Sequence, residues 1–163
     1  RQTSCRQIVE QMLNTGQKQF QQLAARDLDH NLNRHQILTL ASLIQKEAGN
    51  NGEMPVIASV FHNRLQLKMR LASDPTTIYA LGENFDGNLR RRDLRNPSPY
   101  NTYRHRGLPP GPICSPGNQA IMAVINPEPT DFLYFVSRNN GHHQFSRTYK
   151  EHNQAVRKYQ LKQ

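Results

Sequence analysis

Apolar residues recur at helical spacing in several segments of this chain, which predicts amphipathic helices. The clearest segment spans residues 36–48, and the Gly-Asn-Asn-Gly at residues 49–52 is a strong helix stop. The apolar face of this segment comprises Ile37, Leu40, Ala41, Ile44 and Ala48. We therefore expect this helix to lie in the core of the protein.

Similar patterns predict further helices and one β-hairpin. The helices are expected at residues 4–25, 55–67, 74–81, 116–125 and 148–160, and the strands at 132–136 and 143–146 with a turn at 139–141. Asp74 is expected to cap its helix, with Pro75 at the first helical position. The sequence therefore predicts an α+β fold that is mainly helical.

Residues 82–117 show no sustained periodicity and are rich in Pro, Gly, Asn and Tyr. A structureless segment of this length in a small domain is either functional or disordered. We expect an ordered loop, because its prolines stiffen the chain and because Tyr100 and Tyr103 supply rings that can pack.

The 163 residues carry a formal net charge of +9. A basic surface suits polyanions such as nucleic acid, acidic lipid or an anionic wall polymer. No zinc-finger, recognition-helix or RNA-binding motif accompanies the basic residues, which disfavours nucleic acid. The histidines lack metal-ligand spacing. Cys5 and Cys114 could be free or bonded, and the sequence does not decide.

Glu47 is the only acidic residue in the helix at residues 36–48, and it lies at the edge of the apolar face. A carboxyl group partly surrounded by apolar side chains keeps its proton to higher pH, as a general acid requires. A glutamate at a helix end can equally be a surface residue paired with Lys or Arg. Periodicity alone leaves both interpretations open.

Several polar residues are candidates for binding a sugar, whose hydroxyl edges and ring faces suit amide, hydroxyl and aromatic groups. The segment Ser-Pro-Tyr-Asn-Thr-Tyr at residues 98–103 is the richest, although an ordinary turn-rich loop would look the same. Asn63 and Arg64 could reach a ligand or form a surface pair. Asp74 could be a second carboxylate rather than a cap, and Glu151 could serve in an acid–base pair or as support.

Six runs stand in order without large gaps: LASLIQKE at 40–47, VFHNRL at 60–65, MRLASDPT at 69–76, SPYNTY at 98–103, GLPPGPI at 107–113, and HQFS at 143–146 with EHN at 151–153. Together they resemble the catalytic domain of the YceG-like endolytic murein transglycosylases. The resemblance covers about residues 36–159. It implies a lysozyme-like helical core at 36–163. Residues 1–35 would then be a leading arm, or a linker to a preceding LysM-like domain.

The resemblance implies that Glu47 is the catalytic residue. Family members often carry Glu at position 45 as well, whereas this chain has Gln45. The implied reaction cleaves the β-1,4 bond between N-acetylmuramic acid and N-acetylglucosamine. The C6 hydroxyl of the muramic acid attacks its own C1 and leaves a 1,6-anhydro end. Because the nucleophile is intramolecular, one acid suffices, and no cofactor is implied.

The residues expected from this resemblance to line the glycan groove are Asn63, Arg64, Ser73, Asp74, Tyr100, Asn101, Thr102, Tyr103, His143 and Glu151.

The resemblance also implies a parent protein anchored by one N-terminal helix in the cytoplasmic (inner) membrane, with a periplasmic catalytic domain. Its expected partners are peptidoglycan glycan strands and the cell-wall synthesis machinery. Two alternatives stay open: a non-catalytic glycan-binding module, and a two-carboxylate murein hydrolase in which Asp74 or Glu151 activates water.

Overall fold

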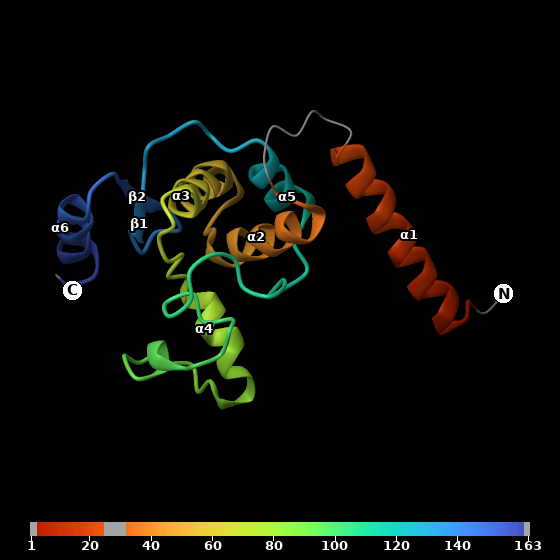
Figure 1. The fold of residues 1–163 in the computed structure, drawn as a ribbon, viewed down its shortest axis with the longest axis horizontal. Helices are drawn as coiled ribbons and strands as arrows, with labels where there is room; N and C mark the ends of the chain where they lie inside the picture. The colour runs from red at the N-terminus through yellow and green to blue at the C-terminus, as the bar shows by residue number, and fades with distance from the viewer. Residues whose placement is uncertain (1–2, 25–31, 162–163) are drawn as a thin grey trace. The chain divides into compact units, whose positions relative to one another are not determined.

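The structure of the chain is a computed structural model in which residues 3–24 and 32–161 are described (Figure 1). The chain divides into two units, residues 1–31 and 32–163. The described part of the first unit contains one helix, α1 (Cys5–Ala24), in agreement with the hydrophobic spacing. The role of residues 1–35 as an arm or a linker stays a prediction. The second unit carries all the other elements.

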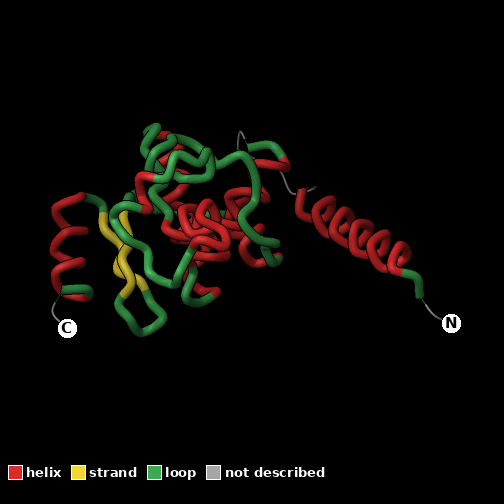
Figure 2. The backbone as a smooth tube through the Cα atoms, turned by 90° about the horizontal axis from the view of Figure 1, so that it is seen from below, coloured by secondary structure: helices red, strands yellow, loops and turns green. Residues whose placement is uncertain are grey.

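The second unit has an α+β fold, as predicted. Its helices are α2 (Arg34–Glu47), α3 (Met54–Gln66), α4 (Asp74–Leu81), α5 (Asn118–Ile125) and α6 (Tyr149–Tyr159), with short 3-10 turns η1 (Asn51–Glu53), η2 (Gly82–Asn84) and η3 (Asp93–Arg95). The strands β1 (Tyr134–Ser137) and β2 (His143–Ser146) form the antiparallel hairpin that Figure 2 shows in yellow. Phe135 lies opposite Phe145 in its register.

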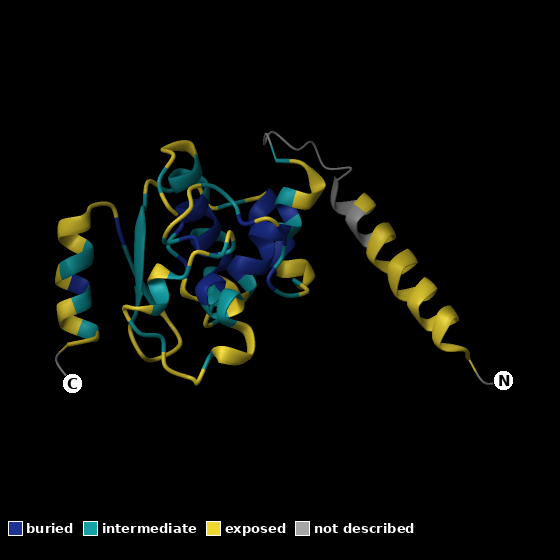
Figure 3. Ribbon diagram, turned by 60° about the horizontal axis from the view of Figure 1, so that its bottom comes forward, coloured by how far each residue is buried: buried dark blue, intermediate teal, exposed yellow. Residues whose placement is uncertain are grey.

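Helices α2, α3 and α5 pack together around the core, where Figure 3 shows most of the buried residues. The largest fully buried apolar side chains are Phe61, Ile37, Leu40, Leu43, Ile44, Ile57, Leu71, Val60 and Val124. Helix α2 is buried on more than the predicted face, because Thr39 and Ser42 are also inaccessible. Their hydroxyls donate to helix carbonyls, so their burial leaves no polar group unsatisfied.

Two polar side chains of α3 hold the segment that leads into the hairpin. Asn63 Nδ2 donates to the carbonyl oxygens of Thr130, at 2.8 Å, and Phe132, at 3.0 Å. Arg64 Nε donates to the Leu133 carbonyl at 2.6 Å. Because α3 takes up these carbonyls, β1 begins at Tyr134, later than the predicted position 132. Helix α6 packs against the hairpin.

The tip of the hairpin contacts the chain just after α2. Asn50 Nδ2 donates to the Gly141 carbonyl at 2.8 Å. A Cβ atom at Gly49 would lie 2.7 Å from the same oxygen, so only glycine allows this approach. Gly141 itself has a φ of 79°, in the region that favours glycine.

The Pro- and Gly-rich loop between α4 and α5 is ordered around Asn101, which is fully buried. Its Nδ2 donates to the carbonyls of Leu94, at 3.0 Å, and Asn96, at 2.8 Å. Its Oδ1 accepts from Tyr103 N at 3.0 Å and Thr77 Oγ1 at 3.2 Å. One amide group therefore ties several turns of the loop to α4.

Two helix starts differ from the prediction by two residues, and one cap residue differs. Asn33 and Gln36 form a capping box, in which each side chain accepts a hydrogen bond from the backbone amide of the other. Helix α2 therefore begins at Arg34 rather than at residue 36. The prediction that Asp74 caps α4 was wrong, because Ser73 occupies the cap position and Asp74 is the first helical residue. Helix α5 begins at Asn118 rather than 116. The reason is that the Gly117 amide donates to Gln45 Oε1, which holds the backbone of Gly117 extended.

Cys5 and Cys114 are both free thiols. The Cys114 Sγ–H donates to the Ser42 carbonyl at 3.4 Å. No helix within residues 3–24 and 32–161 is long and apolar enough to cross a membrane.

We expect Asn101→Ala to lower the free energy of unfolding by about 2–4 kcal/mol, because it leaves two partly buried carbonyls and two donors without their partner. Urea denaturation measures this change. Asn88→Ala is the matched control, since Asn88 is exposed and its side chain makes no hydrogen bond to any described residue. Equal stability of the two variants would contradict the structural role of Asn101.

Candidate active site

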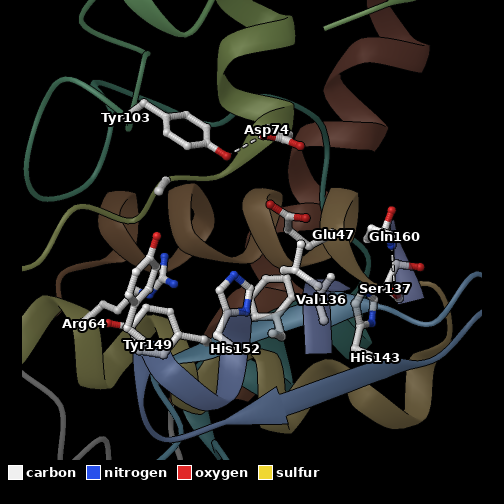
Figure 4. Close-up of a pocket in the computed structure, with 14 residues that line it drawn as sticks. Glu47, Arg64, Asp74, Tyr103, Val136, Ser137, His143, Tyr149, His152 and Gln160 are labelled. Atoms are coloured by element: carbon white, nitrogen blue, oxygen red, sulfur yellow. Dashed lines mark hydrogen bonds between the residues drawn. The ribbon is translucent and has the colours of Figure 1, made fainter. Parts of the chain in front are cut away.

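A cleft of about 540 Å³ lies next to the C-terminal end of α2. Glu47, the last residue of α2, lines it. Figure 4 shows this carboxyl group between Asp74 and Tyr103 on one side and residues of the hairpin and α6 on the other. An acid is therefore presented to an open space bounded by two walls.

The position of Glu47 follows from the burial of α2. The helix is anchored by fully buried residues up to Ile44, and the chain leaves the helix at Ala48, which is extended. Glu47 Oε1 accepts a hydrogen bond of 2.6 Å from Ser73 Oγ. Ser73 is fixed in turn, because its amide donates to Thr102 Oγ1 at 3.0 Å.

Burial raises the pKa of Glu47 from 4.5 to about 7. The hydrogen bond from Ser73 and the positive charge of Arg64 oppose the rise, whereas the negative charge of Asp74 adds to it. Glu47 therefore populates both its acid and its base form near neutral pH. That is the property a group needs to donate a proton in one step and to accept one in the next.

Asp74 and Tyr103 form one wall of the cleft. The Tyr103 hydroxyl donates to Asp74 Oδ1 at 2.5 Å. Burial and the neighbouring Asp74 raise the pKa of Tyr103, which keeps its phenol protonated and able to donate. One oxygen of Asp74 is thus occupied by a fixed donor.

The hairpin and α6 form the opposite wall. Its remaining lining residues, apart from Arg64 and Ala72, are Tyr134, Phe135, Val136, Ser137, His143, Tyr149, His152, Val156 and Gln160. The ring of Tyr134 stacks on that of His152, with centroids 5.3 Å apart. This wall therefore offers flat apolar faces beside polar groups, a combination that suits sugar rings.

Glu53, in η1, orients His143 within this wall. Its Oε2 contacts His143 Nδ1 at 2.8 Å, and its Oε1 accepts from the His143 amide at 3.0 Å. Burial opposes ionisation of Glu53, but the hydrogen bonds from His143 and His142 outweigh it and lower the pKa of Glu53. A carboxylate therefore fixes the His143 imidazole at one end of the cleft.

The structure brings together six of the predicted site residues. Glu47, Arg64, Asp74, Tyr103 and His143 line the cleft, and Ser73 bonds to Glu47. The catalytic and binding roles of these residues stay predictions at this point.

The other five predicted residues do not line this cleft. Asn63 and Asn101 support the backbone, as described above. Thr102 is buried and bonds to the Ser73 amide. The ring of Tyr100 packs against that of Tyr79, with centroids 4.8 Å apart. Glu151 caps α6, where its side chain accepts from the Thr148 amide. Contact of these residues with a substrate stays a prediction.

Sequence reasoning did not single out Tyr134, Ser137, Tyr149, Val156 or Gln160 as site residues. The aromatic strand was visible in the sequence, but the direction of its side chains depends on the register with β2.

Gln45 lies outside the cleft lining, and its Oε1 accepts from the Gly117 amide at 3.0 Å. Glu47 is therefore the acid that this helix presents to the cleft.

A partly buried acid with a raised pKa, in an open cleft with polar and aromatic walls, has the features of a candidate site for acid catalysis. A family model described as the YceG-like family matches residues 1–158. The chain belongs to the YceG-like family, and the resemblance found in the sequence is confirmed.

Curated relatives are similar to most of the chain. The endolytic murein transglycosylase of Bacillus subtilis is 41% identical over 157 residues, which cover 96% of this chain and 43% of the relative. Endolytic murein transglycosylases of two Streptococcus pneumoniae strains are 36% identical over 139 residues, covering 83% of this chain and 25% of each relative.

A solved structure is similar to the fold. The crystal structure of a yceG-like protein from Listeria monocytogenes matches with a TM-score of 0.79 at 39% identity, covering 93% of this chain and 49% of that one. The chain spans less than half the length of these relatives.

We expect Glu47→Gln to stabilise the protein at high pH. The folded state keeps the Glu47 proton up to a pKa of about 7, whereas an ordinary Glu loses it near 4.5, so stability falls as pH rises through this window. Near pH 8 the amide should raise the free energy of unfolding by up to about 3 kcal/mol.

Urea denaturation at several pH values measures this difference, which should vanish near pH 4, where Glu47 is protonated in both states. Glu83→Gln is the control, because Glu83 is exposed and lies outside the cleft. A Glu47→Gln variant no more stable than wild type at pH 8 would show that the carboxylate is well solvated.

Proposed function

We propose that the domain is an endolytic murein transglycosylase that cleaves the β-1,4 bond between N-acetylmuramic acid and N-acetylglucosamine and leaves 1,6-anhydro ends. The observation that carries the proposal is the Glu47 carboxyl group, whose pKa is raised to about 7 and which faces a cleft of about 540 Å³. Similarity to curated endolytic murein transglycosylases supports the same substrate and reaction.

In the first step the protonated Glu47 donates its hydrogen to the bridging oxygen as the bond from that oxygen to C1 of the muramic acid breaks. Positive charge develops on C1 and the ring oxygen. In the second step the C6 hydroxyl attacks C1, and the Glu47 carboxylate takes up the hydroxyl proton. The products are a free hydroxyl on the leaving sugar and an anhydro ring, and no water is consumed.

The surroundings of Glu47 suit both steps. Burial favours the protonated form before the reaction, and the Ser73 hydroxyl and Arg64 stabilise the carboxylate after it. The hydroxyl nucleophile belongs to the substrate, so holding the sugar in a reactive geometry replaces a second catalytic carboxylate. The cleft walls would supply that geometry.

A two-carboxylate hydrolase is the second candidate, because Asp74 lines the same cleft and lies close enough to raise the pKa of Glu47. Asp74 would then activate water, and the product would carry a reducing end. The bond from Tyr103 occupies one oxygen of Asp74, which favours a binding role for this wall.

For the parent protein, we propose an anchor in the cytoplasmic membrane and action on nascent strands outside it. The net charge of +9 suits anionic lipid and wall polymers, which supports this location.

Glu47→Gln should lower turnover of purified peptidoglycan by about 10²- to 10⁴-fold, because the amide has no proton to give. Mass spectrometry of the released muropeptides identifies their end groups, and Glu83→Gln should remain fully active. Anhydro ends lost only in the Glu47 variant support the proposal. Reducing ends would support the hydrolase, and binding without products would indicate a glycan-binding module.

The reaction should slow as pH rises above about 7, because the first step needs the protonated form of Glu47. Ser73→Ala should move this alkaline limit to higher pH, since it removes a hydrogen bond that lowers the pKa. Asp74→Asn should move it to lower pH, since it removes a negative charge that raises the pKa. Profiles of kcat/KM against pH measure both shifts, and shifts in one common direction would contradict this electrostatic account.

A further inference from the structure

Arg64 is a partly buried cation in the cleft, and no acidic residue among those described forms an ion pair with it. Its Nε donates to the Leu133 carbonyl and its Nη1 to the Leu71 carbonyl. A guanidinium has five N–H donors, and these two bonds use two of them, so three remain available. No ion pair compensates its charge within the described residues, which leaves carbonyl dipoles, the Tyr134 ring and a weaker interaction with Glu47.

The aromatic and imidazole groups next to Arg64 do not neutralise its positive charge. Its guanidinium lies over the Tyr134 ring, 5.3 Å from the centroid. Burial and the charge of Arg64 lower the pKa of His152, which favours the neutral imidazole. Figure 4 shows Arg64, Tyr149 and His152 on the same side of the cleft, with His143 at the other end.

The two carboxyl groups of the cleft do not neutralise this end. Glu47 carries its proton for much of the time near neutral pH, and Asp74 accepts from Tyr103 on the facing wall. The Nδ1 atom of His152 is also buried and has no partner among the described residues. The spare N–H groups of Arg64 are therefore donors without an anionic partner among the described residues, and the unpartnered His152 nitrogen lies on the same side of the cleft.

We propose that the Arg64 end of the cleft binds a carboxylate of the substrate. A guanidinium matches a carboxylate with two parallel hydrogen bonds, and the aromatic rings beside it exclude water and strengthen them. The inference rests on the proposed function, since it concerns which muramic acid is bound. The carboxylate comes either from the lactyl group of a peptide-free muramic acid or from an attached peptide.

The binding also has a consequence for Glu47. Arg64 lowers the pKa of Glu47 in the free protein. A carboxylate that pairs with Arg64 offsets that charge, so an occupied site would help Glu47 to keep its proton. Substrate recognition and acid catalysis would then be coupled through one side chain.

The test compares four substrates with the chain of 163 residues. The first pair consists of peptide-free glycan strands with lactyl carboxylates and the same strands with these groups converted to amides. The second pair consists of peptide-bearing strands with peptide carboxylates and the same strands with those groups converted to amides. We expect KM to be about tenfold lower for the carboxylate form of one pair, as a charge-assisted bidentate contact implies. The pair that shows the difference identifies the source of the carboxylate.

Arg64→Gln should remove this difference by raising KM for the carboxylate substrate to the value for the amide. Arg70→Gln loses the same charge at an exposed position outside the cleft and should keep the preference. Equal KM values for both forms in the wild type would overturn the proposal, as would an unchanged preference in Arg64→Gln.

Binding measurements with Glu47→Gln separate this proposal from the proposed function. This variant keeps Arg64, so a preference for carboxylate strands does not depend on turnover or on the folding of an Arg64 variant. Anhydro products without a charge preference would refute the carboxylate site alone. A charge preference in binding, with no products from the wild type, would refute the transglycosylase alone.

Discussion

The cost of removing one carboxyl group from water is the constraint on which the site depends. Glu47 ends a helix that is buried from Thr39 to Ile44, so its position is set by the core and not by the cleft. The only direct hydrogen bond recorded for its carboxyl group, among the described residues, comes from Ser73. A second bond of the same kind would favour the ionised form and would weaken the acid. The site therefore combines precise placement with poor solvation.

The long loop acts on Glu47 through Ser73. Thr102 accepts from the Ser73 amide, and its hydroxyl is 2.8 Å from that of Thr76. Asn101 holds the loop in the shape that this contact needs. In the fold, Asn101 and Thr102 are buried and support the loop and Ser73, and their contact with a substrate stays a prediction. The loop is ordered because side chains such as Asn101, Asp93 and Asn96 bond to its backbone groups.

The sequence was sufficient for the helices and the hairpin, because each depends on local spacing of apolar residues, whereas this spacing left the surroundings of Glu47 open. It was not sufficient for the contacts between distant segments. Whether Asn63 faces a ligand or the carbonyls of Thr130 and Phe132 depends on how α3 packs against the strand. The role of Glu53 likewise depends on a turn about 90 residues further along the chain. No local pattern encodes either approach.

The contact between Gly49 and Gly141 bears on how the protein can accommodate a glycan. The hairpin wall and the end of α2 meet backbone to backbone, and Asn50 locks the junction. No side chain lies between Gly49 and Gly141, so peptide groups set the distance between the two segments. Unlike side chains, peptide groups cannot change rotamer to widen it. Under the proposed function, the distortion that bond cleavage needs would then fall on the sugar ring and not on this junction.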